Sequence, residues 1–164
     1  MLIAVQVVLG IALSSAKLRH FTKLEGWAKA QAISGLVFAF FILQHLFSLA
    51  MTRLYFDIET DFYWPGSVMS GPPFTYYFTA YYFLGLFAIF VHAGAAVRFG
   101  LIRSRNRRWA EPAAVAITAT GAVTAGVIVL MLLGSFYLID LPDEWVAYLQ
   151  WYYPAFEPPS ATGR

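Results

Sequence analysis

Apolar residues gather in four long stretches, and within each stretch polar positions are rare. A helix that crosses a bilayer needs about 20 mostly apolar residues. The first stretch is short, but no basic segment precedes it, which favours an uncleaved span over a signal peptide. Pro112 opens the last stretch and suits a first helical turn. We therefore predict four transmembrane helices, at about residues 1–16, 32–52, 74–97 and 112–139.

The segments between these stretches differ in charge. Lysine and arginine dominate residues 17–31 and 98–111, whereas acidic residues dominate the loop 53–73 and the tail 140–164. Basic loops next to short spans stay on the cytoplasmic side of a membrane. This pattern predicts that both basic loops are cytoplasmic and that both termini face outward. Termini on the same side require an even number of spans, which supports four.

Two outer segments carry further signals. The loop 53–73 contains Trp64-Pro65-Gly66 and Gly71-Pro72-Pro73, which predict a turning segment and no span. In the tail, after Pro142, aromatic residues recur at helical spacing, which predicts a short helix in the outer interface. The expected architecture is an all-α integral membrane protein with one membrane domain over residues 1–164. It is a four-helix bundle with a short C-terminal interfacial helix.

Composition supports a membrane protein. Of the 164 residues, 60% are hydrophobic and 12% charged, against about 45–50% and about 25% in a soluble domain. This excludes a soluble globular enzyme, a disordered segment and a conventional nucleic-acid binder. The chain has no cysteine, which excludes thiol nucleophiles, iron–sulfur ligation and cysteine-based zinc sites.

Charged clusters outside the spans have two readings each. The arginine run of residues 103–108 either faces anionic lipid or docks an acidic face of a cytoplasmic partner. It is too short and too close to the bilayer for nucleic acid. The carboxylates of Asp57, Glu59 and Asp61 either coordinate a cation or form a solvated acidic loop.

Two histidines, His45 and His92, are the ionisable residues inside the predicted spans. An imidazole in hydrocarbon is costly without a partner, so such a residue suggests function. Each either bonds a neighbouring helix or water, or ligates a metal. Because the spans contain no carboxylate, haem b ligation is favoured over a proton relay, with His45 and His92 as axial ligands of the iron.

The neighbours of the two histidines at helical spacing differ. Small residues accompany His92, which lets a flat cofactor or another helix approach closely. Hydroxyl and aromatic residues accompany His45, and Gln44 lies beside it. A helix face of this composition suits a porphyrin edge or a quinone head group. The His92 face comprises Tyr81, Gly85, Ala88 and Ala96, and the His45 face comprises Ser34, Phe38, Phe41, Ser48 and Leu49.

Two segments resemble haem helices of the membrane-anchor cytochrome b subunits of succinate dehydrogenases and fumarate reductases. Residues 27–35 (WAKAQAISG) and 41–46 (FILQHL) resemble the opening haem helix, in which a Ser-Gly or Thr-Gly pair precedes a histidine by about ten residues. Residues 90–98 (FVHAGAAVR) resemble a second haem helix, in which small residues and a basic residue follow the histidine. The resemblance covers roughly residues 24–104.

The resemblance implies a subunit that binds haem b and passes electrons between a cytoplasmic iron–sulfur and flavoprotein part and quinone. Ser34 and Gln44 would then lie near a quinone or a haem propionate. The chain departs from the family's larger anchors, which supply four haem histidines on five helices, whereas two-chain anchors supply one ligand per subunit.

Depth separates the two histidines. At about 1.5 Å of rise per residue they differ in depth by roughly 14 Å, whereas two imidazoles on one iron need nitrogens about 4 Å apart. We therefore predict that they do not share one haem within a chain. Either each has a partner from another subunit or from a two-fold copy at the same depth, or no haem is bound.

The leading hypothesis is thus a non-catalytic, cytochrome-b-like anchor of a quinone-linked complex in a bacterial plasma membrane. The alternative is a haem-free accessory or assembly subunit of a larger membrane complex. A carrier is disfavoured, because the spans contain no charge and no mid-span proline.

Overall fold

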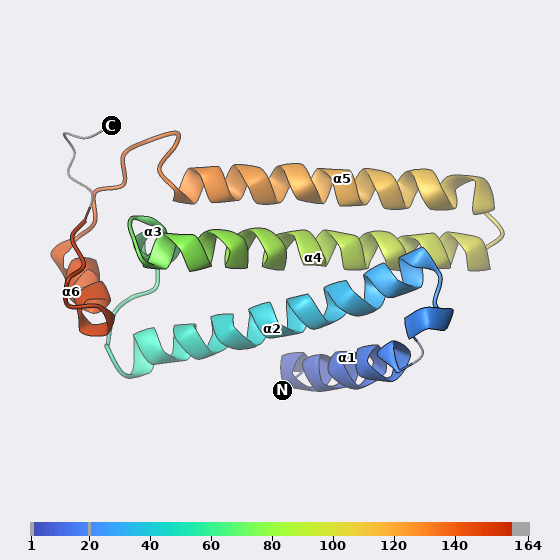
Figure 1. Ribbon diagram of the computed structural model, residues 1–164, viewed down its shortest axis with the longest axis horizontal. Helices are drawn as coiled ribbons and strands as arrows, with labels where there is room; N and C mark the ends of the chain where they lie inside the picture. The colour runs from blue at the N-terminus through green and yellow to red at the C-terminus, as the bar shows by residue number, and fades with distance from the viewer. Residues whose placement is uncertain (1, 20, 159–164) are drawn as a thin grey trace. The chain divides into compact units, whose positions relative to one another are not determined.

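The computed structural model describes residues 2–19 and 21–158, which are helical with short connections (Figure 1). No strand occurs within these residues. The elements in chain order are α1 (Leu2–Leu18), the short 3-10 helix η1 (Phe21–Lys23), α2 (Gly26–Leu54), α3 (Tyr63–Met69), α4 (Phe74–Arg103), α5 (Arg107–Leu132) and α6 (Asp143–Tyr152).

Three of these helices, α2, α4 and α5, are long and apolar enough to cross a bilayer, at 29, 30 and 26 residues. They identify an all-helical integral membrane protein, as the composition predicts. Helix α1, at 17 residues, is shorter than these three, so the fourth span stays a prediction. Helix α6 confirms a helix after Pro142, and its interfacial position also stays a prediction.

Helix α5 has other bounds than the predicted last span. Helix α5 begins five residues before Pro112 and ends at Leu132, well before Ile139, so Pro112 lies beyond its first turn. The helix stops because Gly134 adopts a left-handed conformation, with φ of 71°. Its N–H donates to the Met131 carbonyl at 3.0 Å, and the next N–H, of Ser135, donates to the Leu130 carbonyl at 3.0 Å. This is a glycine C-cap of the Schellman type.

The other two spans also extend beyond their predicted ends. Helix α2 includes six residues before position 32, and α4 continues six residues past Val97 to Arg103. Charged side chains at helix ends reach the interface along their aliphatic stems, so a helix continues where an apolar stretch stops. The loop 53–73 contains the short helix α3, which was not predicted, because Pro65 and Gly66 indicate turns.

The chain divides into two compact units. Unit 1 comprises residues 1–43 and 84–125, and unit 2 comprises residues 44–83 and 126–164. Helices α2, α4 and α5 therefore contribute one part to each unit. Each unit is described by itself below.

Small residues let the helices of unit 1 pack closely. The Phe41 ring lies against the backbone of Gly85, and Phe90 lies against Gly121. A side-chain carbon added at Gly94 would stand 2.9 Å from the Ala114 carbonyl oxygen. Such close backbone approach is typical of helix packing in membranes, where van der Waals contact drives association.

Unit 2 is built around aromatic rings. Trp145 of α6 is fully buried, and Tyr148, Leu149 and Phe156 complete the buried cluster. Helix α3 packs against α6. The Tyr148 hydroxyl lies 3.3 Å from the Thr52 hydroxyl, so α6 is also bonded to the end of α2.

Candidate functional site

His92 of α4 is oriented by the backbone of α2. It is half-buried, and its Nδ1 atom lies 3.1 Å from the Gln31 carbonyl oxygen. A carbonyl can only accept, so this contact requires the tautomer with a proton on Nδ1. Nε2 then keeps its lone pair, the form in which a neutral imidazole binds a metal.

Gly35 makes room for the His92 ring. A side-chain carbon added at Gly35 would stand 3.2 Å from Cε1 and 3.3 Å from Nδ1 of His92, and 2.9 Å from the Ser14 hydroxyl oxygen. Parts of α1, α2 and α4 thus meet at this glycine. Any larger residue here would push the ring away from its carbonyl partner.

Ser34 shares the acceptor of His92. Its side chain is buried, and its hydroxyl donates to the Gln31 carbonyl at 3.2 Å. A carbonyl oxygen has two lone pairs and can accept both bonds. The structure therefore brings predicted site residues Ser34 and His92 to one atom, with the Ser14 hydroxyl beside Gly35.

Several residues expected beside a cofactor instead pack helices. Gly85, predicted on the His92 face, is covered by the ring of Phe41, which was predicted on the His45 face. Ala88 is buried and Ala96 is exposed. Gly85 thus serves helix packing, and a cofactor beside the other small residues stays a prediction.

His45 and Gln44 belong to unit 2 and have their own neighbours there. The His45 ring centroid lies 4.8 Å from that of Trp64 in α3, at an interplanar angle of 53°. The Tyr77 hydroxyl donates to the Gln44 amide oxygen at 2.5 Å. The contact with Trp64 was not predicted, because the sequence gives no sign that the loop 53–73 contains a helix.

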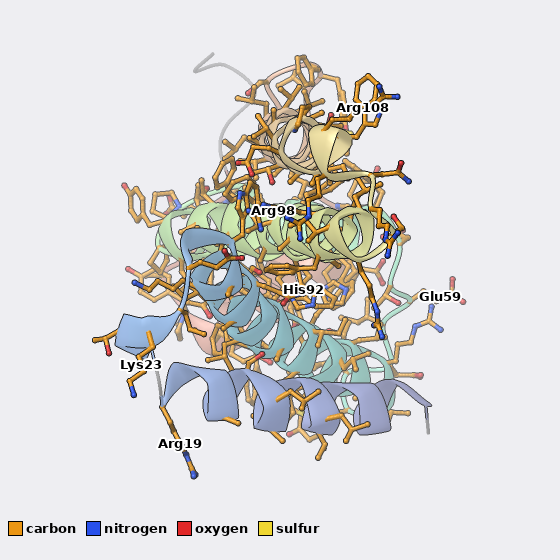
Figure 2. The ribbon with its side chains drawn as sticks, turned by 90° about the vertical axis from the view of Figure 1, so that its right-hand side faces the viewer. Arg19, Lys23, Glu59, His92, Arg98 and Arg108 are labelled. Carbon is orange, nitrogen blue, oxygen red and sulfur yellow. The ribbon has the colours of Figure 1, made fainter. Side chains whose placement is uncertain are left out.

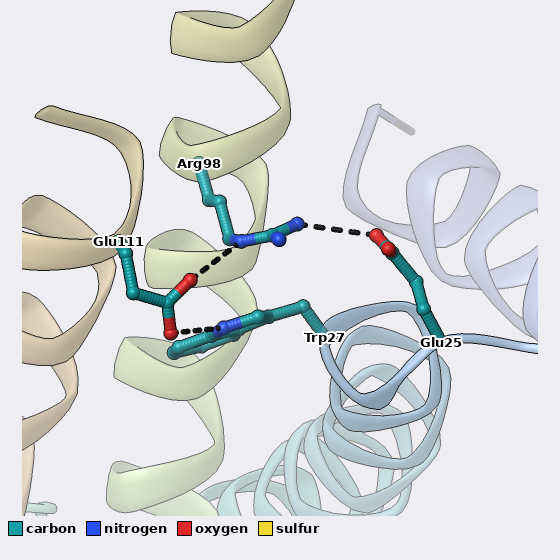
Figure 3. Close-up of polar contacts among 4 residues, drawn as sticks. All are labelled: Glu25, Trp27, Arg98 and Glu111. Carbon is teal, nitrogen blue, oxygen red and sulfur yellow. Dashed lines mark hydrogen bonds and ion pairs between the residues drawn. The ribbon is translucent and has the colours of Figure 1, made fainter. Parts of the chain in front are cut away.

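A charged network at the basic end of unit 1 was also not predicted. Arg98 donates from Nε to Glu111 at 2.9 Å and from Nη1 to Glu25 at 3.1 Å. The Trp27 indole N–H donates to the other Glu111 oxygen at 2.8 Å (Figure 3). The signal available in the sequence was one glutamate in each basic loop, each placed to pair with a helix-end arginine.

The basic residues of unit 1 fall into two groups. Arg98 and His92 lie among the helices, whereas Arg19, Lys23 and Arg108 point away from them (Figure 2). The outward residues are available to lipid or a partner.

Neither histidine lies in a compact multi-ligand metal site. Within residues 2–19 and 21–158, no three His, Cys, Asp or Glu side chains gather closely enough to hold a metal ion. A haem iron takes one or two protein ligands, and His92 offers one with its tautomer set. A scan of protein-family models and searches of curated proteins and of solved structures found no match to this chain.

Proposed function

We propose that this chain is a membrane-anchor, cytochrome-b-like subunit of a quinone-linked electron-transfer complex, similar to the anchors of succinate dehydrogenase and fumarate reductase. The observation that carries the proposal is the contact between His92 Nδ1 and the Gln31 carbonyl. Histidines that ligate metals usually donate their other ring N–H to a carbonyl or carboxylate, which fixes the ring and its tautomer.

The residues around His92 fit an axial ligand of haem b. The backbone of α2 holds Nδ1, and Gly35 leaves space for the ring. A bound haem would supply one-electron transfer between a reduced partner and quinone. The protein's own contribution would be to orient one imidazole through its Nδ1–H, so that Nε2 is the nitrogen presented to the iron.

The second axial ligand of such a haem is proposed to come from another subunit or a second copy. Ten residues of α2 separate Gly35 from His45, a helix rise of about 15 Å. Two imidazole nitrogens on one iron stand only about 4 Å apart. In this proposal His45 serves a separate site, with Gln44 near a quinone or propionate.

The proposed orientation keeps both basic loops, 17–31 and 98–111, on the cytoplasmic side of a bacterial plasma membrane, with both termini outside. Helix α1 acts as a fourth span and α6 lies in the outer interface. The cytoplasmic side then faces an iron–sulfur and flavoprotein part.

Much of each span remains available to lipid or sister subunits. Only 22% of the residues in the most apolar stretch of α2, α4 and α5 are buried within the chain. Single apolar residues on a surface are normal, but long helices with few buried apolar side chains need an apolar environment. This supports both the bilayer and a larger complex as partners.

A haem-free accessory or assembly subunit is the second candidate. Phe41 on Gly85 and Phe90 on Gly121 favour it, because they fill the small-residue positions with the chain's own rings. In this candidate, the His92 bond joins α2 and α4 and serves no cofactor.

Haem content separates the two candidates. The intact complex, purified from the native membrane, is measured by haem quantification and by a reduced-minus-oxidised spectrum. We expect a b-type absorption change that His92→Leu abolishes or halves, while His20→Leu, a histidine outside the spans, leaves it unchanged. Absence of that change in the wild-type complex, or full haem content in both His92→Leu and His45→Leu, would favour the haem-free subunit.

A further inference from the structure

A pocket of about 320 Å³ lies at the basic end of unit 1, between the end of α4 and the start of α5. Its walls are Arg98 and Ile102 of α4, and Arg107, Ala110 and Glu111 of α5. A water molecule occupies about 30 Å³ of the liquid, so the pocket has space for about ten waters. That is enough for a phosphate group with its ester arms.

The pocket has two arginines with donors to spare. Arg98 commits Nε to Glu111 and Nη1 to Glu25, so its Nη2 keeps both N–H groups. Arg107 is exposed, and within the described residues it forms no ion pair. A guanidinium presents paired donors that match phosphate oxygens.

The two glutamates hold Arg98 in place but do not cancel the charge of this end. Glu111 accepts from Arg98 and from Trp27 through different oxygens, so both of its oxygens have a donor. The surrounding sequence adds Arg103, Arg105 and Arg108, which leaves a net charge of +3 once Glu25 and Glu111 are subtracted from the five arginines. The pocket therefore lies in a positive field.

The position of the pocket selects among phosphate-bearing ligands. It lies where two apolar helices end, and Trp109, 56% exposed, stands beside it in sequence. Exposed tryptophan at a helix end is typical of the level of lipid headgroups. Ile102 and Ala110 add apolar wall, which suits a ligand with a hydrocarbon part.

We propose that this pocket binds the phosphate of an anionic phospholipid headgroup, with Arg107 and the Nη2 group of Arg98 as its donors. It is a defined lipid site, distinct from the diffuse attraction that any basic loop has for an anionic surface. The site needs neither haem nor quinone, so it stands independently of the proposed electron transfer.

The test compares two arginines of the same turn. The full chain is reconstituted in phosphatidylcholine bilayers with increasing phosphatidylglycerol, and lipid retained per chain is measured by native mass spectrometry. Arg107→Gln removes a pocket donor. Arg108→Gln removes the same charge from a side chain that stacks on Trp109, with its guanidinium carbon 5.5 Å from the ring centroid, and is not part of the pocket wall.

A specific site predicts unequal losses. We expect Arg107→Gln to weaken phosphatidylglycerol retention about tenfold more than Arg108→Gln. Both variants lose one positive charge, but only Arg107→Gln also loses a charged hydrogen bond to the phosphate. Equal losses in the two variants would overturn the proposal and leave only diffuse attraction. Both variants must show the wild-type circular dichroism, which is expected since both residues are exposed.

A further measurement separates lipid from free phosphate. Millimolar inorganic phosphate is added to the wild-type chain during the lipid measurement. We expect phosphatidylglycerol retention to be unchanged, since the apolar wall contributes to lipid binding alone. Complete displacement of the lipid by phosphate would overturn the lipid assignment and identify a site for a soluble anion.

Discussion

Units 1 and 2 tie the ends of their helices together in opposite ways. In unit 1, Arg98 joins Glu25 and Glu111 by directional charged bonds, and the carboxylate side chains are 59% exposed. In unit 2, Trp145 and Phe156 join α6 to its surroundings by burial and form an aromatic cluster. Exposed ion pairs contribute little to stability each, whereas a buried aromatic side chain contributes several kcal/mol.

The two regions contribute different properties, specificity of helix contacts in unit 1 and stability in unit 2. The charged network fixes which helix ends meet, because each donor has one acceptor at a set distance. The aromatic cluster supplies most of the free energy that holds its segment folded. Substitutions in the aromatic cluster are therefore expected to lower the free energy of unfolding more than substitutions in the charged network.

The largest effect is expected at Trp145. Trp145→Ala should lower the free energy of unfolding by about 3–5 kcal/mol, because it empties a fully buried site. The measurement is denaturant titration in mixed micelles. Trp151→Ala, on the same helix but with its side chain 58% exposed, is the matched control and should cost much less. Equal losses would mean that the cluster does not hold unit 2.

Trp145→Phe sharpens the same measurement. The Trp145 indole N–H is buried and finds no acceptor among the described residues. Replacing it removes an unsatisfied donor while keeping an aromatic ring, so the loss should be well below that of Trp145→Ala. A loss as large as that of alanine would indicate that the indole N–H is hydrogen-bonded in the folded protein.

The next effect is expected at the glycine contacts of unit 1. Gly85→Ala should cost about 1–3 kcal/mol, because the added carbon would overlap the Phe41 ring. Gly100→Ala, on the same helix with open space around it, should be neutral or stabilise by up to about 1 kcal/mol. The same unfolding titration measures both. If the two variants behaved alike, close packing at Gly85 would be disproved.

Substitutions at two helix ends, one in each unit, are expected to change stability by smaller amounts and with opposite signs. Arg105, which ends α4, has φ of 64°, and Gly134, which ends α5, has φ of 71°. Arg105→Gly should stabilise by about 0.5–1 kcal/mol, since glycine tolerates this region. Gly134→Ala should destabilise by about 1 kcal/mol. Thermal unfolding followed by circular dichroism distinguishes the two signs.

The smallest effect is expected in the charged network. Glu111→Gln keeps an acceptor for Trp27 but weakens the bond from Arg98, so the loss should be below that of every buried substitution above. Added salt should reduce the difference from wild type, because exposed charges are screened. A loss that salt does not change would mean that the network is shielded by lipid or by another subunit.

The sequence predicted the membrane class and the approximate place of three spans, because long apolar stretches admit few structures. The helices that contain these spans have other ends. Helix α5 already begins at Arg107, before the apolar stretch, and only the backbone conformation at Gly134 shows where it stops. The length of an apolar stretch can be read from the sequence, whereas the end of a helix depends on a few local hydrogen bonds.

The residues of the candidate site were chosen from the sequence, but their contacts were not predicted. His92 and Ser34 were identified by residue type and spacing, yet their shared acceptor is a main-chain oxygen, which no side-chain pattern encodes. Trp27 and Glu111 are far apart in sequence, so their bond depends on helix packing. The haem, quinone and partner subunits stay predictions that spectroscopy and reconstitution must test.

The acceptor that sets the His92 tautomer has a genetic consequence. Because this oxygen belongs to the peptide group of residue 31, every amino acid encoded there still supplies it. Saturation mutagenesis at codon 31 should therefore leave the imidazole orientation intact wherever α2 remains helical. The constraint on this contact therefore falls on codons 35 and 92, which supply the space and the ring.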